Sequence, residues 1–129
     1  MTVVPIPTSR ITDWRTFHDV FAETLGFPDY YGRNGNAWID CMTYVDDPDA
    51  GMTRITVGAG DVLTLQLGKV ADFAARCPEQ YAALIECVAF VNWCRLDIGE
   101  RSILALAFHK TRARASRAPQ PSDARPDTA

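Results

Sequence analysis

Two apolar segments of strand length are set among stretches with helical spacing, and this alternation narrows the possible folds of the chain. The segments are DVLTLQL at residues 61–67 and SILALAF at residues 102–108. The first is dense in alternating aliphatic side chains, which is typical of a strand buried in a sheet. The second is an uninterrupted apolar run, which predicts a strand covered on both faces. A proline-interrupted segment, TVVPIP, predicts a further strand at an edge of the sheet.

Four helices are predicted between these strands. Apolar residues three and four apart predict an amphipathic helix over residues 13–25, with a capping residue before it at Thr12 and Gly26 ending it. A second helix is predicted for GNAWIDCMTYV, residues 35–45, and a short one for KVADFAAR. The segment from Pro78 through Trp93 predicts a long helix largely covered by its neighbours.

The order of these elements predicts an α/β fold with a small three-stranded parallel sheet and about four helices packed on it. Between the second helix and the strand at 61–67, a glycine-rich region is expected to form turns and loops, with a short hairpin strand at residues 54–57.

The composition is that of one ordinary soluble domain. The chain has 129 residues, of which 47% are hydrophobic and 22% charged. No apolar run is long enough to span a membrane, and the first residues lack the pattern of a signal peptide. A cytoplasmic location in a bacterial type of cell is therefore expected, without membrane contact.

The charge is distributed unevenly along the chain. Residues 110–129 carry five basic and two acidic side chains, whereas residues 1–109 carry the other eight basic and fourteen acidic ones. We expect a folded domain over 1–109 and a disordered basic tail, rich in Arg, Pro and Ser, over 110–129. An acidic domain is a poor candidate for direct contact with nucleic acid and a reasonable one for a basic protein partner.

The sequence offers little for catalysis or for a metal or cofactor. The four cysteines (Cys41, Cys77, Cys87 and Cys94) form no CxxC pair, and the spacing of His18 and His109 does not suit a zinc site, so buried free thiols are expected. The acidic cluster DDPD at 46–49 raises the alternative of a divalent-ion loop, but it lacks the glycine and distal glutamate of a calcium loop. His18, expected to be half-buried or at the surface, has no nucleophile nearby in the sequence. The chain is therefore predicted not to be an enzyme.

The stretch FPDYYGRNGNAWIDCMT, residues 27–43, joins a structured loop to the second helix. Proline fixes one backbone angle in the loop, Gly32 allows a positive φ, and Asn34 is a good N-cap. Helical spacing points one set of side chains inward: Trp38, Cys41, Met42 and Val45. It points another set outward, which Tyr30 can border: Asn36, Ile39, Asp40 and Thr43.

This stretch resembles the signature of the barstar family, small intracellular inhibitors of bacterial secreted ribonucleases. The match is gap-free at Pro28, Tyr30, Tyr31, Gly32, Asn34, Ala37, Asp40 and Cys41. The predicted order of elements over residues 1–108 resembles the family as well. The resemblance implies a barstar-like fold and an inhibitor that presses its second helix and the loop before it into a ribonuclease active site.

The resemblance also implies which residues meet this basic, extracellular-type ribonuclease. Asp40 falls on the family's central carboxylate, which takes the place of an RNA phosphate. Tyr30 falls on an interface tyrosine, and Gly35, Thr43 and Tyr44 fall on the flanks. For Tyr31, Gly32, Asn34 and Cys41 we favour a purely structural role in the loop and the helix start.

The chain differs from the family at some of these positions. Asn36 stands where the family has a second acidic residue, and Ile39 stands where it has an exposed tryptophan. The family's acid on the last helix has Asn92 as its nearest counterpart. These changes imply a rewritten partner specificity, with Arg33 and Asn36 as candidate new contacts. They also leave open an alternative, a barstar-fold interaction module or immunity protein whose partner is not a ribonuclease.

Overall fold

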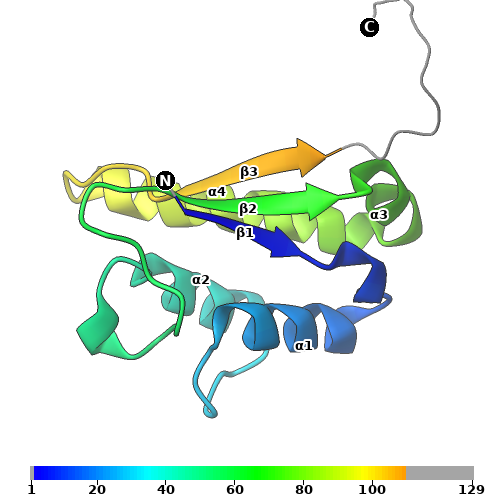
Figure 1. Cartoon of the computed structure of the whole chain (residues 1–129), viewed down its shortest axis with the longest axis horizontal. Helices are drawn as coiled ribbons and strands as arrows, with labels where there is room; N and C mark the ends of the chain where they lie inside the picture. The colour runs from blue at the N-terminus through cyan, green and yellow to red at the C-terminus, as the bar shows by residue number, and fades with distance from the viewer. Residues whose placement is uncertain (1, 110–129) are drawn as a thin grey trace, which may run out of the picture.

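Three parallel strands form one sheet in the structure, a computed structural model that describes residues 2–109 (Figure 1). The strands are β1 (Thr2–Ile6), β2 (Leu63–Gly68) and β3 (Leu104–His109), in the spatial order β1-β2-β3. The α-helices are α1 (Trp14–Leu25), α2 (Gly35–Thr43), α3 (Val70–Arg76) and α4 (Pro78–Asp97), and the short 3₁₀ helices are η1 (Thr8–Arg10) and η2 (Pro48–Ala50). The predicted α/β fold is therefore confirmed. The predicted basic tail, 110–129, lies outside the described residues.

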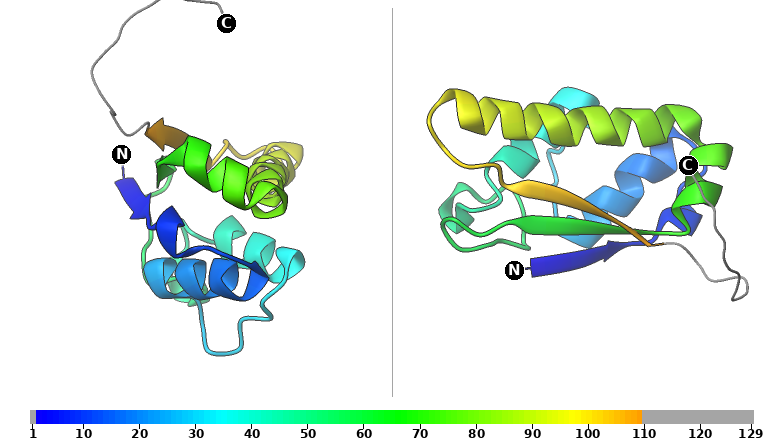
Figure 2. Two further views of the ribbon diagram at one scale, coloured as in Figure 1. Left: turned by 90° about the vertical axis from the view of Figure 1, so that its right-hand side faces the viewer. Right: turned by 90° about the horizontal axis from the view of Figure 1, so that it is seen from above.

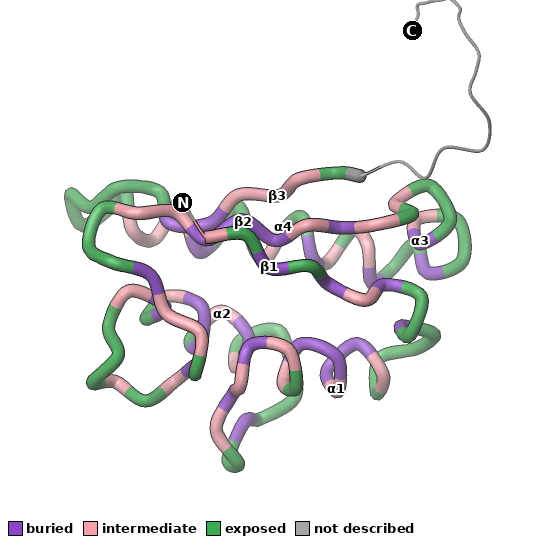
Figure 3. The backbone as a smooth tube through the Cα atoms, in the orientation of Figure 1, coloured by how far each residue is buried: buried purple, intermediate pink, exposed green. Residues whose placement is uncertain are grey.

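The core lies between the sheet and the helices, because α1, α2 and α4 all pack on the same side of the sheet (Figure 2). Side chains alternate along β1, so that Val4 is buried and Val3 is exposed. Val4 pairs with Leu65, which is fully buried in the central strand and pairs in turn with Leu106. Burial alternates along β1, whereas most residues of the central strand β2 are buried (Figure 3).

Two predictions about how far an element is buried by its neighbours are wrong. β3 was expected to be covered on both faces, but it is an edge strand, and α1, α2 and α4 all lie on one side of the sheet (Figure 2). The long helix was expected to be largely covered, but α4 buries only one side, with Leu84 and Val88 inward and Trp93 outward. Both errors have the same cause: apolar character along an element does not show whether another element packs on it.

Local chemistry accounts for the limits of α1. Asp13, one residue after the expected cap, accepts a hydrogen bond from the Thr16 N–H at 2.9 Å, and the Thr16 hydroxyl accepts one from the Asp13 N–H at 3.0 Å. At the other end Gly26 is left-handed with φ 74°. A Cβ there would lie 2.6 Å from the Cβ of Arg54, so only glycine fits.

The predicted hairpin strand at 54–57 is wrong, because no strand forms there. The backbone groups of this segment find partners in the helical half of the molecule instead: the Arg54 N–H donates to the Leu25 carbonyl at 2.9 Å, and the Val57 N–H donates to the Val45 carbonyl at 3.0 Å. The segment therefore covers the C-terminal ends of α1 and α2.

All four cysteines are free thiols, as expected. Cys41 and Cys77 are buried, whereas Cys87 and Cys94 on α4 are only half-buried. Of the helices that the structure describes, none combines the length and the apolar character needed to cross a membrane.

Candidate protein-binding surface

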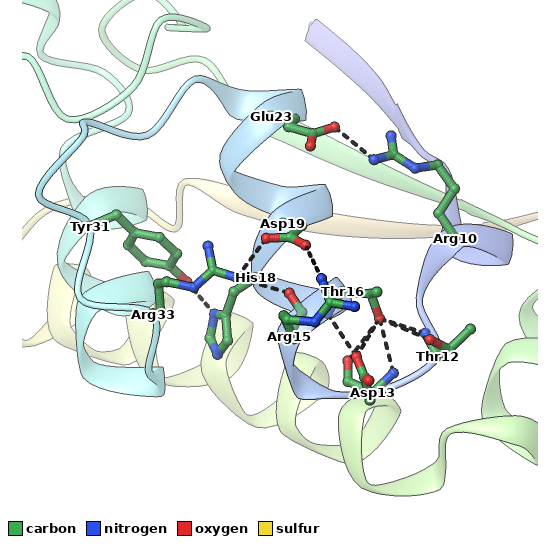
Figure 4. A network of polar contacts seen from close by, with 10 residues as sticks. All are labelled: Arg10, Thr12, Asp13, Arg15, Thr16, His18, Asp19, Glu23, Tyr31 and Arg33. Atoms are coloured by element: carbon green, nitrogen blue, oxygen red, sulfur yellow. Dashed lines mark hydrogen bonds and ion pairs between the residues drawn. The ribbon is translucent and has the colours of Figure 1, made fainter.

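Two side chains of α1 hold the loop that precedes α2. The hydroxyl of Tyr31 and Nδ1 of His18 share a hydrogen bond of 2.6 Å (Figure 4). The Tyr31 ring also packs on Phe27, with centroids 4.7 Å apart. His18 is buried, which corrects the prediction of a surface or half-buried histidine. Burial lowers the pKa of His18 and raises the pKa of Tyr31, so both groups are uncharged near neutral pH.

Arg33 forms the second attachment of the loop. Its backbone is left-handed with φ 56°, whereas Gly32, where we expected a positive φ, has none. The Arg33 guanidinium donates to Asp19 Oδ1 at 2.6 Å and to the Arg15 carbonyl at 3.0 Å, and so lies against α1 (Figure 4). Nothing in the sequence indicated this conformation, since arginine is not a residue that favours it.

Helix α2 ends at Thr43, two residues before the predicted end at residue 45, but the inward and outward directions of its side chains follow the prediction. Asn34 caps it by accepting a hydrogen bond from the Ala37 N–H at 2.8 Å. Trp38, Cys41, Met42 and Val45 are buried; Asn36 and Asp40 are exposed; Ile39 and Thr43 are half-buried. The outward row therefore has the mixed polar and apolar character expected from the sequence.

Asp40 is an exposed acid in the middle of α2. Within residues 2–109 it makes no hydrogen bond and no ion pair. Aromatic side chains stand at either end of the helix: Tyr30, in the loop before it, is 74% exposed, and Tyr44, just after it, is also exposed. The Tyr30 hydroxyl donates a hydrogen bond to the sulfur of Met52 at 3.6 Å. Asp40 and its neighbours are thus available to an external surface.

An ion pair that sequence reasoning missed fixes the end of α2. The guanidinium of Arg95 on α4 donates to both carboxylate oxygens of Asp46, at 3.1 and 2.7 Å, and to the Thr43 carbonyl at 3.1 Å. These hydrogen bonds lower the pKa of Asp46. Because the pair is partly buried and bidentate, it holds the C-terminal end of α2 against α4.

The groove between α2 and α4 adds residues that sequence reasoning also missed. A pocket of about 320 Å³ is lined by Asn36 and Ile39 from α2 and by Glu86, Cys87 and Phe90 from α4. Asn92, the nearest counterpart of the family's last-helix acid in sequence, does not reach this groove. Its amide group instead makes hydrogen bonds to the backbone of Ile103 and Leu104, where β3 begins.

This arrangement suits contact with another protein better than catalysis. In the described part of the chain, His, Cys, Asp and Glu side chains form no group of three or more that could hold a metal ion. Burial raises the pKa of Cys41 to about 11, so its thiol stays protonated and is a poor nucleophile. The outward row instead offers amide and carboxylate groups on a rigid helix, and the exposed rings of Tyr30 and Tyr44 lie at its two ends, a combination that suits a protein interface.

The fold is that of a small α/β protein, and the exposed side of α2 is suited to contact with another protein. A family model described as "Barstar (barnase inhibitor)" matches residues 1–109, and the chain therefore belongs to the barstar family. No curated protein matches the chain. The family is one of inhibitors and not of enzymes, which confirms the prediction that the chain is not an enzyme.

Proposed function

We propose that this chain inhibits a bacterial ribonuclease, either secreted or delivered as a toxin, by filling its active site with α2 and the loop before it. The observation that carries the proposal is Asp40, an exposed carboxylate with no ion pair within residues 2–109, at the centre of the outward row. A ribonuclease binds RNA phosphates with cationic side chains, and a carboxylate on a rigid helix complements the same positive field.

The residues around Asp40 support a protein contact of this kind. Tyr30 supplies a large, exposed aromatic ring, the residue type that often dominates binding energy. One side of the proposed contact surface, at the start of α2, consists of Gly35, Asn36 and Ile39. The other side, at the end of α2, consists of Thr43 and Tyr44. Arg33 contributes the exposed part of its side chain beside its ion pair with Asp19.

Inhibition assays with charge-matched variants test the proposal. The full chain is titrated against a panel of secreted bacterial ribonucleases that includes barnase, alongside Asp40→Ala and the control Glu79→Ala, which removes an exposed acid from the first turn of α4. We expect Asp40→Ala to weaken binding by about 2 to 5 kcal/mol and to change the free energy of unfolding by less than about 1 kcal/mol. The control should inhibit as the natural chain does.

Equal losses of binding and folding stability in Asp40→Ala would make Asp40 a structural residue. An exposed helix position with no hydrogen bond within residues 2–109 contributes little to folding, so the two measurements should separate clearly.

A second function is favoured by one observation. Asn36 is exposed on the outward row where the family has an acid, so this surface carries one negative charge fewer toward a basic active site. A barstar-fold interaction module, or an immunity protein whose partner is not a ribonuclease, fits this loss. Capture of a partner by the natural chain but not by Asp40→Ala, with no ribonuclease of the panel inhibited, would favour this second function. A cytoplasmic location is our prediction for either.

A further inference from the structure

One row of α4 exposes two aromatic rings between two acids. Glu86, Phe90, Trp93 and Asp97 follow one another at four-, three- and four-residue spacing, so they lie along one side of the helix. Phe90 is 47% exposed and Trp93 58% exposed, and their rings stack with centroids 5.7 Å apart. We call these four residues the α4 row.

Folding does not explain this row. The side chains that α4 buries against the rest of the molecule are on its other side: Gln80, Leu84, Val88 and Val91. A solvent-exposed pair of large rings with acidic neighbours is the usual appearance of a surface that another molecule covers. A solvated helix face would carry polar residues at these positions.

The α4 row is continuous with the proposed inhibitory surface. Phe90 and Glu86 line the pocket of about 320 Å³ together with Ile39 and Asn36 of α2. Asp40 follows Ile39 directly on the exposed side of α2. A partner that reaches Asp40 across this groove therefore also meets Phe90.

The charges on this surface select a basic partner. Asp40, Glu86 and Asp97 are all exposed and take part in none of the ion pairs between residues 2 and 109. Arg95, the arginine between Trp93 and Asp97, points the other way to bind Asp46. A second copy of the chain would set these acids against each other, whereas a basic protein would neutralise them.

We infer that the α4 row is a second half of the partner-binding surface, occupied by the cognate ribonuclease. In this arrangement the enzyme places an apolar side chain from the rim of its active site in the α2–α4 pocket, against Phe90. A lysine or arginine of the same rim lies over Trp93, between Glu86 and Asp97, where both the ring face and the carboxylates attract it. The inference rests on the proposed function and adds to it the residues that determine which ribonuclease is bound.

Truncation of the two rings tests the inference. The full-length variants Phe90→Ala and Trp93→Ala are titrated against the same ribonuclease panel, barnase included, beside Asp40→Ala. The matched control is Ile98→Ala, which removes an apolar side chain that is 72% exposed and outside the row. For the enzyme that the natural chain inhibits, each ring variant should raise Kd at least about tenfold, as expected for an aromatic anchor. The control should stay within about twofold.

Folding is monitored by thermal unfolding, and Phe90→Leu, which keeps an apolar side chain in the pocket, should recover most of the affinity lost in Phe90→Ala. Strong loss in Asp40→Ala together with unchanged Kd in both ring variants would overturn the inference and leave the proposed function standing. Absence of inhibition by the natural chain across the panel would overturn both. A dimer that Phe90→Ala dissociates would also overturn the inference, because a second copy would then cover the row.

Discussion

At the scale of single residues, neighbouring side chains of α1 shape the loop that carries Tyr30. His18 binds the Tyr31 hydroxyl at 2.6 Å, and the adjacent Asp19 binds the guanidinium of Arg33 at 2.6 Å. The two attachments fix the loop on either side of Gly32. The position of Tyr30 therefore depends on residues of another helix, which lie outside the proposed binding surface.

Arg33 allows a direct test of backbone strain. Its φ of 56° costs a residue with a Cβ about 1 kcal/mol or more and costs glycine little. Arg33→Ala and Arg33→Gly both lose the ion pair with Asp19, so comparing them isolates the backbone contribution. We expect Arg33→Gly to be more stable than Arg33→Ala by about 1 kcal/mol in urea unfolding. The reverse order, which is usual at right-handed positions, would contradict the left-handed conformation.

His18 predicts a pH dependence of folding. Burial lowers its pKa in the folded chain below the ordinary value of 6.5, so the unfolded chain binds more protons as the pH falls through this range. The stability contributed by neutral His18 is thus complete above pH 6.5 and is lost as the pH falls toward the lower, folded pKa. Free energies of unfolding measured between about pH 5 and 7.5 should fall more steeply in the natural chain than in His18→Gln, which does not titrate. Parallel curves would show that His18 is not the group responsible.

At the scale of elements, two polar side chains on the inward side of α4 attach this helix to other parts of the molecule. Arg95 ties it to the segment after α2. The amide of Asn92 donates to the Leu104 carbonyl at 3.0 Å and accepts from the N–H groups of Ile103 and Leu104 at 2.9 and 3.0 Å. The start of β3 is therefore attached to α4 as well as to β2.

Removal of the Asn92 amide should loosen β3 selectively. Asn92→Ala leaves three backbone groups without their partner, and we expect it to lower the free energy of unfolding by about 2 to 3 kcal/mol. Amide hydrogen exchange at Leu104 should accelerate more than exchange at Leu65 in the central strand. The control Asn36→Ala removes an exposed amide of α2 and should cost less than about 0.5 kcal/mol. Similar costs for both variants would contradict the structural role of Asn92.

At the scale of the whole molecule, the distribution of charge favours a basic protein partner. Residues 1–109 have fourteen acidic and eight basic side chains. The surface proposed for binding carries three of these acids, on α2 and α4, which lie side by side. A field of this sign raises the rate of encounter with a basic protein and is screened by salt.

Association with an inhibited ribonuclease should accordingly be salt-dependent. Between ionic strengths of about 20 mM and 500 mM we expect the association rate constant to fall about tenfold or more, while the dissociation rate changes much less. Stopped-flow fluorescence measures both rates. An association rate constant that does not change with salt concentration would contradict electrostatic steering of the partner.

The sequence by itself determined the order of elements, the three-stranded parallel sheet and the outward position of Asp40. These features depend on residues close together in the chain. Examples are Asn34, which caps α2, and Trp38, which points inward; both lie in the stretch that resembles the family signature. The tertiary structure decided which distant residues meet. It brought Phe90 beside Ile39, and it left the outer row of α4 uncovered although that row carries two large aromatic rings. The physical reason is that helical spacing specifies the faces of an element, whereas burial depends on which other elements pack against them.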